Sequence, residues 1–402
     1  MKKYIFSLLI IFTAFTFVKC KEEAPELKPV EEESNYKSIT KLYEVSLNDF
    51  RALAQVFGQT SFLDKIKHGV EVYKIVYETT YQGQPINASG VVYIPTDLTS
   101  PAPILSIQHV TTFVQTEAPS MASSFSGLEY FAAGGYITFI PDFIGYGESA
   151  NIFHPYYDKE HSAAAVIDII KAGKKYLTSE NIPINDNLFL AGYSEGGYVT
   201  MAAAKEIDQN PQHGMNLSAV AAGAGGYDLR EMLETVTSNE EYPYPAYLAF
   251  VIMSYNKTYN WNRPLNYFFN EKYAAVLPSL MDGTKNGTQI NNSLTTNLSE
   301  LFNKDFFQRL KLGEEQELEE AFISNSFGYD EWTPTVPIRL YHGTADEIVP
   351  DSNTEKVYNL LNSKGATNLE LKKISGGTHG STLIPMIQSL VPWFESLQAN
   401  KS

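Results

Sequence analysis

The sequence has a single cysteine, Cys20, so the chain cannot form a disulfide bond within itself. Basic residues are also few: 30 lysines and arginines stand against 46 aspartates and glutamates, which gives a formal net charge of −16 at pH 7. No cluster of lysines or arginines offsets this excess. A nucleic-acid-binding protein is therefore excluded, since a phosphate backbone is bound by a basic surface.

The sequence also lacks a complete metal-binding motif. The stretch DGTKNGTQINNS, which starts at Asp282, begins like a calcium-binding loop. Ser293 stands where such a loop needs a bidentate glutamate. We interpret this stretch as a polar loop and expect neither a metal nor a cofactor.

The first twenty residues are typical of an export signal. Lys2 and Lys3 precede an apolar run over residues 4–18, which is short for a membrane span but fits the apolar part of a signal peptide. Cys20 follows directly, and this start resembles that of a bacterial lipoprotein, although Lys19 replaces the usual small residue. The resemblance implies a signal peptide over residues 1–20 and a lipid on Cys20. A signal peptide that is simply cleaved is the alternative.

Residues 21–40 are acidic and contain prolines, which is typical of a flexible tether. The charged residues directly after Cys20 resemble the export signal of Bacteroidetes surface lipoproteins. Together these resemblances imply an exported bacterial protein that is anchored to the outer membrane through its N-terminal lipid and displayed at the cell surface.

From residue 70 onward, short β-rich runs are followed by polar or glycine-rich loops, several of which lead into helical segments such as residues 162–176. This alternation predicts an α/β fold, with a mostly parallel sheet that carries helices on both faces. We expect eight strands, at residues 70–80, 86–94, 104–108, within 135–149, and at 188–191, 217–222, 338–341 and 369–374.

The alternation stops over residues 231–333, where strands are absent and the helical pieces are interrupted by prolines and polar residues. We predict that this segment is a helical cap inserted into a core made of residues 41–230 and 334–402. Ten aromatic residues gather in residues 241–270. They form either the core of the cap or the lining of a pocket for an acyl or aryl group. The candidates for such a lining are Tyr242, Tyr244, Tyr247, Trp261 and Phe268.

A serine stands among glycines at a predicted strand-to-helix junction, in the stretch LFLAGYSEGGYVTMAAA over residues 188–204. The pattern G-x-S-x-G at such a junction is typical of a nucleophile elbow, which exposes the serine hydroxyl on a strained turn. Ser194 is therefore the candidate nucleophile. The backbone N–H of Glu195 opens the following helix and is a candidate oxyanion donor. Tyr193, beside the serine, is a candidate substrate contact.

A serine hydroxyl needs a base to remove its proton and a carboxylate to orient that base. Among seven histidines we favour His379, because the stretch ISGGTHGST places it in a glycine-rich loop after the last predicted strand. Asp346 follows the preceding strand in RLYHGTADEIVP and is the favoured acid, with Glu347 and Asp351 as alternatives. The order serine, acid, histidine is the one found in α/β-hydrolases.

The motifs GYSEGG, PDFIGYGES, AVAAGAGGYDL, HGTADEIVP and GGTHGS together resemble the α/β-hydrolase superfamily, and most of all its secretory-lipase branch. The resemblance implies an α/β-hydrolase sheet with a helical cap, and the roles of nucleophile, base and acid for Ser194, His379 and Asp346. It also implies a second oxyanion N–H from the loop of residues 109–112, where we choose Thr111. Two places depart from the branch: Glu195 replaces a glutamine, and QHVTT replaces a His-Gly pair.

These residues predict a serine carboxylic-ester hydrolase, of esterase or lipase type, that forms an acyl-enzyme. Its substrate would be a small-molecule, lipid or glycan ester. One alternative is a serine peptidase of α/β-hydrolase type, but enzymes like prolyl oligopeptidase carry a large propeller for which this chain has no room. The other is a surface binding protein that has lost the chemistry, and the intact triad argues against it.

Overall fold

The structure is a computed structural model that describes residues 35–56 and 64–399. The predicted signal peptide, the lipidation site Cys20 and residues 21–34 of the predicted tether lie outside the described residues. Within the described part of the chain, no helix is both long and apolar enough to traverse a bilayer.

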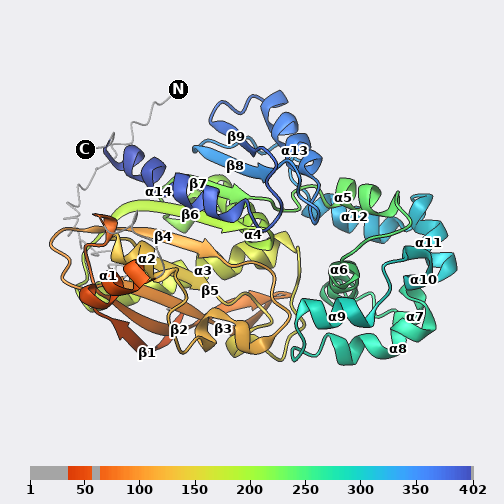
Figure 1. Cartoon of the computed structure of the whole chain (residues 1–402), viewed down its shortest axis with the longest axis horizontal. Helices are drawn as coiled ribbons and strands as arrows, with labels where there is room; N and C mark the ends of the chain where they lie inside the picture. Colours follow the sequence, from red (N-terminus) through yellow and green to blue (C-terminus); the bar gives the residue numbers. More distant parts are fainter. Residues whose placement is uncertain (1–34, 57–63, 400–402) are drawn as a thin grey trace, which may run out of the picture. The chain divides into compact units, whose positions relative to one another are not determined.

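A nine-stranded sheet is built in the order β1-β2-β3-β5-β4-β6-β7-β8-β9 (Figure 1). Strands β1, β2, β3 and β5 pair antiparallel, whereas the pairs from β5 through β4 to β9 are parallel. The predicted α/β class with a mostly parallel sheet is therefore confirmed. The strands are β1 (Tyr36–Val45), β2 (Val70–Tyr81), β3 (Gln84–Pro95), β4 (Ala102–Gln108), β5 (Ile137–Pro141), β6 (Ile184–Tyr193), β7 (Leu217–Gly223), β8 (Ile338–Gly343) and β9 (Leu369–Ile374).

The edge strand β1 corrects the prediction of eight strands. Its sequence, YKSITKLYEV, is mostly exposed or half-buried and lacks the apolar run by which the other strands were recognised. It pairs antiparallel with β2 and so belongs to the sheet. Residues 36–40 are therefore not part of a tether, and the predicted boundary between tether and core at residue 40 is wrong.

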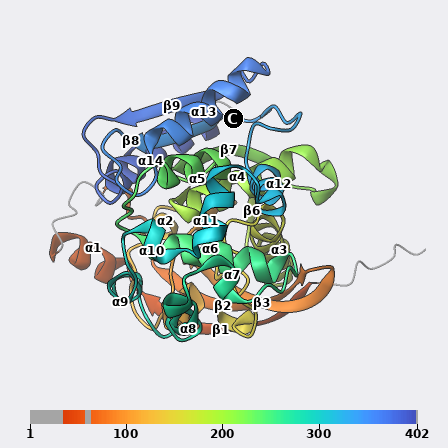
Figure 2. The ribbon, with the colours of Figure 1, turned by 90° about the vertical axis from the view of Figure 1, so that its right-hand side faces the viewer.

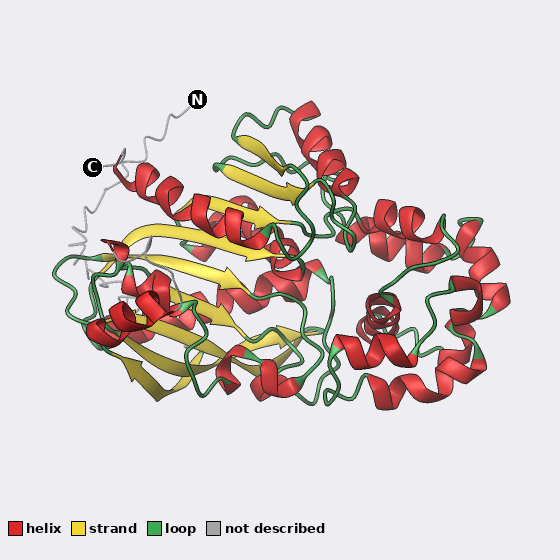
Figure 3. Ribbon diagram, in the orientation of Figure 1, coloured by secondary structure: helices red, strands yellow, loops and turns green. Residues whose placement is uncertain are grey.

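Helices cover both faces of the sheet (Figure 3). Helices α3 and α4 pack on one face, and α2 and α14 pack on the other. The helices outside the cap are α1 (Leu47–Val56), α2 (Glu129–Ala133), α3 (Lys159–Ser179), α4 (Glu195–Gln209), α13 (Asp351–Ser363) and α14 (Leu383–Ala399).

Alternate residues of the central strands serve two hydrophobic cores, because successive side chains of a strand point to opposite faces. Ile104 and Leu188 belong to the core under α3 and α4, whereas their neighbours Leu105 and Phe189 belong to the core under α2 and α14. Both faces are thus apolar. This double burial explains why these strands read as short, continuous apolar runs in the sequence.

Helices α5 to α12 follow β7 and precede β8, and they lie beyond the carboxyl ends of the parallel strands (Figures 1 and 2). The predicted cap, residues 231–333, falls between these two strands. The cap shares one hydrophobic cluster with the α3 and α4 face of the sheet. Its helices are α5 (Leu229–Thr237), α6 (Pro245–Thr258), α7 (Leu265–Phe268), α8 (Glu271–Leu280), α9 (Gly287–Ser293), α10 (Leu298–Leu301), α11 (Lys304–Lys311) and α12 (Gln316–Asn325).

Asparagine side chains start several cap helices. Asn270, Asn286, Asn297 and Asn303 each accept a backbone N–H in the first turn of the helix that they precede. Asn286 also forms a capping box with Gln289. The stretch that begins like a calcium loop is therefore a turn followed by the capped helix α9.

Candidate active site

Ser194 joins the end of β6 to the start of α4 in a strained conformation, with φ 58° and ψ −124°. Residues other than glycine rarely adopt positive φ, so the surrounding structure must hold this turn in place. A Cβ atom at Gly196 would lie 2.1 Å from the carbonyl oxygen of Gln108, and one at Gly192 would lie 2.1 Å from that of Gly196. The glycines around the serine are therefore required by close backbone contacts.

Backbone hydrogen bonds hold the elbow between β6 and α4 against the neighbouring strand β7. The N–H of Ser194 donates to the carbonyl of Gly223, at 2.8 Å, and the N–H groups of Gly197 and Tyr198 donate to the carbonyl of Ser194. These bonds hold the serine at the carboxyl end of β6. The Glu195 N–H is the first of helix α4, where no intrahelical acceptor exists, so it is available to an oxyanion.

The structure brings the three predicted triad residues together from β6, the loop after β8 and the loop after β9. The Oγ of Ser194 lies 2.9 Å from Nε2 of His379, and Nδ1 of His379 lies 2.8 Å from Oδ2 of Asp346. The other carboxylate oxygen, Oδ1, accepts the N–H groups of Ile348 and Val349. A continuous hydrogen-bonded path therefore leads from the serine hydroxyl to a buried carboxylate.

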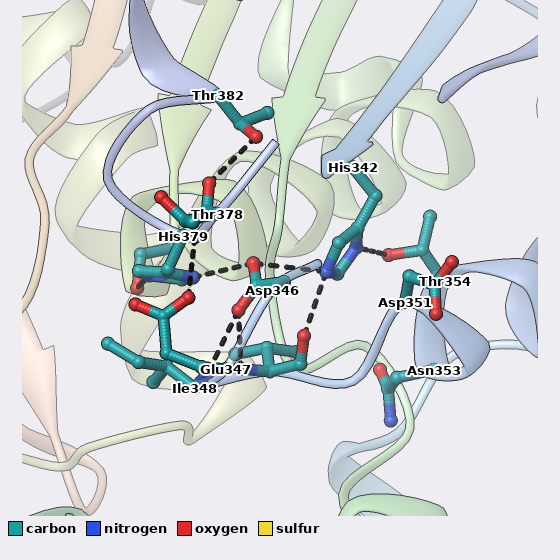
Figure 4. Close-up of polar contacts among 12 residues, drawn as sticks. His342, Asp346, Glu347, Ile348, Asp351, Asn353, Thr354, Thr378, His379 and Thr382 are labelled. Atoms are coloured by element: carbon teal, nitrogen blue, oxygen red, sulfur yellow. Dashed lines mark hydrogen bonds and ion pairs between the residues drawn. The ribbon is translucent and has the colours of Figure 1, made fainter. Parts of the chain in front are cut away.

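A second histidine, His342, also contacts Asp346 (Figure 4). Its Nε2 lies 3.3 Å from Oδ2 of Asp346 and 2.9 Å from the carbonyl oxygen of Val349. Since both of these partners are acceptors, Nε2 carries a proton, and Nδ1 pairs with the hydroxyl of Thr354. Burial opposes ionisation of Asp346, but the hydrogen bonds from His342 and His379 outweigh it and hold its pKa well below the usual value.

The alternative acids make other contacts. Glu347 accepts the backbone N–H of His379 at 3.1 Å and so supports the loop rather than the imidazole ring. Asp351 is the first residue of α13 and forms an ion pair with Lys373 at 2.8 Å. Among the three carboxylates that the sequence proposed, the geometry therefore favours Asp346.

The carboxyl group of Glu195 is turned inward and buried, with 2% of its side chain exposed. Its Oε1 lies 2.7 Å from Nε2 of His154, and Nδ1 of His154 lies 2.6 Å from the carbonyl oxygen of Ile144. Both imidazole nitrogens thus face oxygens. The side chain that departs from glutamine is therefore held inside the protein by His154.

Thr111 lies in the loop after β4, and its Oγ1 is 3.1 Å from the hydroxyl of Tyr156. Tyr156 in turn lines the cavity at Ser194. The loop of residues 109–112 is therefore close to the nucleophile. Its assignment as the source of the second oxyanion N–H stays a prediction.

A cavity of about 50 Å³ opens at Ser194 between the sheet and the cap. Two of the predicted lining residues, Tyr242 and Tyr247, contribute to its wall. Tyr156 and Tyr157 were missed, since they lie in a loop ahead of α3 with no motif to mark them. The full lining is Tyr156, Tyr157, Ser194, Leu229, Met232, Leu233, Tyr242, Tyr247, Leu248, Val251, Ile252, Phe322, Ile348 and Val349.

The other predicted substrate contacts lie outside the lining of this cavity, and their contact with a substrate stays a prediction. Tyr193 donates its hydroxyl to the backbone carbonyl of His379 at 2.5 Å, so it holds the histidine loop. Tyr244 packs its ring against Tyr242 outside the lining. Trp261 stacks on a neighbouring cap tyrosine. Phe268 is fully buried, edge-on to another phenylalanine, and therefore belongs to the core of the cap.

Comparison with known proteins shows a family to which the chain is similar in sequence. The sequence pattern of the family described as secretory lipase matches residues 111–402. Lipase 5 of Candida albicans is 24% identical over 64% of this chain and 54% of its own length, and Lipase 9 of the same yeast is 22% identical over 66% and 57%. The chain thus spans little more than half the length of these lipases.

Solved structures share the fold over nearly the whole chain. A crystal structure from Legionella pneumophila has a TM-score of 0.82 and 25% identity, and covers 91% of this chain and 99% of its own. The rice cell wall degrading esterase LipA from Xanthomonas oryzae has a TM-score of 0.77, 21% identity and coverage of 88% and 95%. Candida antarctica lipase A in its closed state has a TM-score of 0.68, 18% identity and coverage of 90% and 82%.

Proposed function

The chain belongs to the secretory lipase family, and from this premise we propose that it hydrolyses carboxylic esters with Ser194 as the nucleophile. The observation that carries the proposal is the unbroken path of hydrogen bonds from Ser194 through His379 to Asp346, at 2.9 and 2.8 Å. Such a path is what a serine hydroxyl requires to lose its proton as it attacks.

In the first half of the proposed reaction, Oγ of Ser194 attacks the acyl carbon while its proton moves to Nε2 of His379. The carbonyl π electrons move onto oxygen, and the Glu195 N–H and a second N–H from the 109–112 loop hold this oxyanion. When the oxyanion collapses, the bond to the alcohol oxygen breaks. His379 returns its proton to that oxygen, and the acyl group remains on Ser194.

In the second half, water replaces the alcohol. His379 removes a proton from the water, whose oxygen attacks the acyl carbon, and the proton then passes to Oγ of Ser194 as the acid leaves. Asp346, which stays ionised because its pKa is lowered, steadies the positive imidazole in both halves.

The cavity at Ser194 supports short acyl or alcohol groups as substrates. A volume of about 50 Å³ accommodates several groups the size of a water molecule, since each needs about 10–15 Å³ on this measure. Membership in a family described as secretory also supports export of the protein.

The proposal is tested with p-nitrophenyl esters of rising acyl length. Ser194→Ala should abolish hydrolysis while the melting temperature stays near that of the wild type, because the elbow accepts a smaller side chain. Asp346→Asn should lower kcat by about 10³- to 10⁴-fold, since the wrong imidazole tautomer is then favoured.

Asp351→Asn is the matched control for the acid, because Asp351 begins the helix that follows this loop and pairs with Lys373. It should stay within about threefold of the wild type. Retention of a tenth of the activity by Ser194→Ala, or a larger loss in Asp351→Asn than in Asp346→Asn, contradicts the assignment.

A further inference from the structure

One tyrosine in the wall of the cavity at Ser194 carries a buried hydroxyl group that the described part of the protein leaves unpaired. Tyr242, which precedes α6 in the cap, lines this cavity, and only 6% of its surface is exposed. Its hydroxyl oxygen is buried and has no hydrogen-bond partner among residues 35–56 and 64–399. A buried polar group without a partner is unfavourable, so its presence at a reaction site calls for a reason.

Two other cavity tyrosines differ in this respect. The hydroxyl of Tyr156 pairs with Oγ1 of Thr111 at 3.1 Å, and that of Tyr157 accepts the N–H of Gly226 at 3.4 Å. Their polar atoms are therefore engaged by the protein. The hydroxyl of Tyr242 is buried and has no such partner in the part of the chain that the structure describes.

Tyr242 is kept protonated, so it can act as a donor. Burial, first of all, and then the neighbouring tyrosines and Asp346 raise the pKa of its hydroxyl above the usual value.

The remainder of the wall is largely apolar, with Leu229, Met232, Leu248, Val251 and Ile252 among its residues. A plain hydrocarbon chain would satisfy these side chains but would leave the Tyr242 hydroxyl unpaired. A chain with an oxygen atom in place of one methylene would satisfy both. Sites built to hydrogen-bond a polar group discriminate strongly against analogues that lack it.

We propose that Tyr242 is a specificity-determining residue that donates a hydrogen bond to an oxygen atom within the short chain of the ester. The preferred substrate would then carry an ether, hydroxyl or carbonyl oxygen where a simple fatty ester carries a methylene group. This inference rests on the proposed ester hydrolysis at Ser194, and it identifies the chemical class of the substrate.

Two pairs of isosteric esters test the proposal and tell the acyl side from the alcohol side. The acyl pair is p-nitrophenyl methoxyacetate and p-nitrophenyl butanoate, and the alcohol pair is 2-methoxyethyl acetate and butyl acetate. We expect Tyr242→Phe to lower kcat/KM for the oxygen-containing ester of one pair by at least about tenfold and to leave its hydrocarbon partner within about twofold. Because the variant is compared with the wild type on the same ester, differences in intrinsic reactivity between the esters do not affect the result.

Tyr73→Phe is the control for the loss of a hydroxyl, because Tyr73 lies on β2 and bonds Glu71, away from the cavity. It should change none of the four rates. Since Tyr242 has no partner in the protein, Tyr242→Phe should not lower the melting temperature. If Tyr242→Phe lowers the rates of both esters of a pair equally, or changes neither pair, the proposed role of Tyr242 is wrong. The proposed ester hydrolysis at Ser194 is not affected by that result. Wild-type protein that hydrolyses none of the four esters overturns the proposed function and this inference with it.

Discussion

At the scale of single residues, Asp346 shows how one carboxylate is kept ionised inside the protein. Its side chain is fully buried, and it faces imidazole nitrogens of His379 at 2.8 Å and His342 at 3.3 Å. Two backbone N–H groups hold its other oxygen. His342 therefore supports the acid from the side opposite the proposed base.

The low pKa of Asp346 gives a testable dependence of stability on pH. Its folded-state pKa lies below the value of about 3.9 expected in the unfolded chain, so the carboxylate adds stability above about pH 4 that is lost as the pH falls through the folded pKa. His342→Leu removes one of the groups that lower this pKa. We expect a deficit in the free energy of unfolding at pH 7 that shrinks toward pH 2, measured by urea unfolding.

Thr354→Val is the matched control for this experiment, because it removes the hydroxyl that pairs with His342 without touching Asp346. Its deficit should not vary with pH over the same range. A deficit of His342→Leu that is also constant with pH would mean that His342 stabilises the fold without acting through Asp346.

The buried pair of Glu195 and His154 gives a second prediction at this scale. His154→Phe leaves the Glu195 carboxyl buried without its partner, which typically costs about 3–5 kcal/mol. Adding Glu195→Gln, which replaces the buried carboxyl group by an amide, should restore more than half of the lost stability and of the esterase rate. A double-mutant cycle of urea unfolding and kcat measures this coupling. Additive effects of the two substitutions would show that the pair does not act as a unit.

Ser194, Asp346 and His379 could be proposed as a triad from the sequence because each follows a strand beside glycines, which is a local signal, and the structure brings their side chains together. Sequence reasoning missed His342, His154, Tyr156 and Tyr157, whose roles depend on contacts between distant parts of the chain. His154 and Glu195, for example, are 41 residues apart. The motif does predict Glu195 as the residue after the nucleophile, but nothing local indicates where its carboxyl group points.

At the scale of elements, contacts between distant parts of the chain also explain why the sequence did not predict strand β1 or the orientation of the aromatic rings in the cap. The buried central strands were predicted from their apolar runs, whereas β1 is half-exposed and gains its stability from pairing with β2. In the cap, the composition indicated only that aromatic residues are numerous. Which rings face the cavity and which fill the core depends on how the cap helices fold over the sheet.

Phe268 and Tyr247 separate these two roles of cap aromatics. Phe268 is fully buried in the cap core, whereas Tyr247 lines the cavity. Phe268→Ala should lower stability by about 3–5 kcal/mol and leave the ratio of rates on short and long esters unchanged. Tyr247→Ala should shift that ratio by about tenfold toward longer acyl groups, because it enlarges the cavity. Thermal melts and rates on a series of esters of rising acyl length, measured on both variants, test this prediction. Equal ratios of the rates on short and long esters in the two variants would contradict it.

At the scale of the whole molecule, the lipoprotein prediction concerns a part of the chain outside the described residues. The sole cysteine follows an apolar signal segment, and the matched family is described as secretory. We expect Cys20→Ser to move the protein from the membrane fraction to the soluble fraction of a bacterial host, with no acyl mass at its N-terminus. Unchanged fractionation would reject the lipid anchor.

The order of the triad along the chain bears on when activity can arise during synthesis. Ser194 is made before the cap, whereas Asp346 and His379 follow it and take their places only when β8 and β9 have joined the edge of the sheet. A nascent chain that has passed the ribosome only as far as β7 holds a nucleophile without its base. On the proposed mechanism, a chain that has not yet added β8 and β9 to the sheet is therefore inactive, and ester hydrolysis begins only when that edge of the sheet is complete.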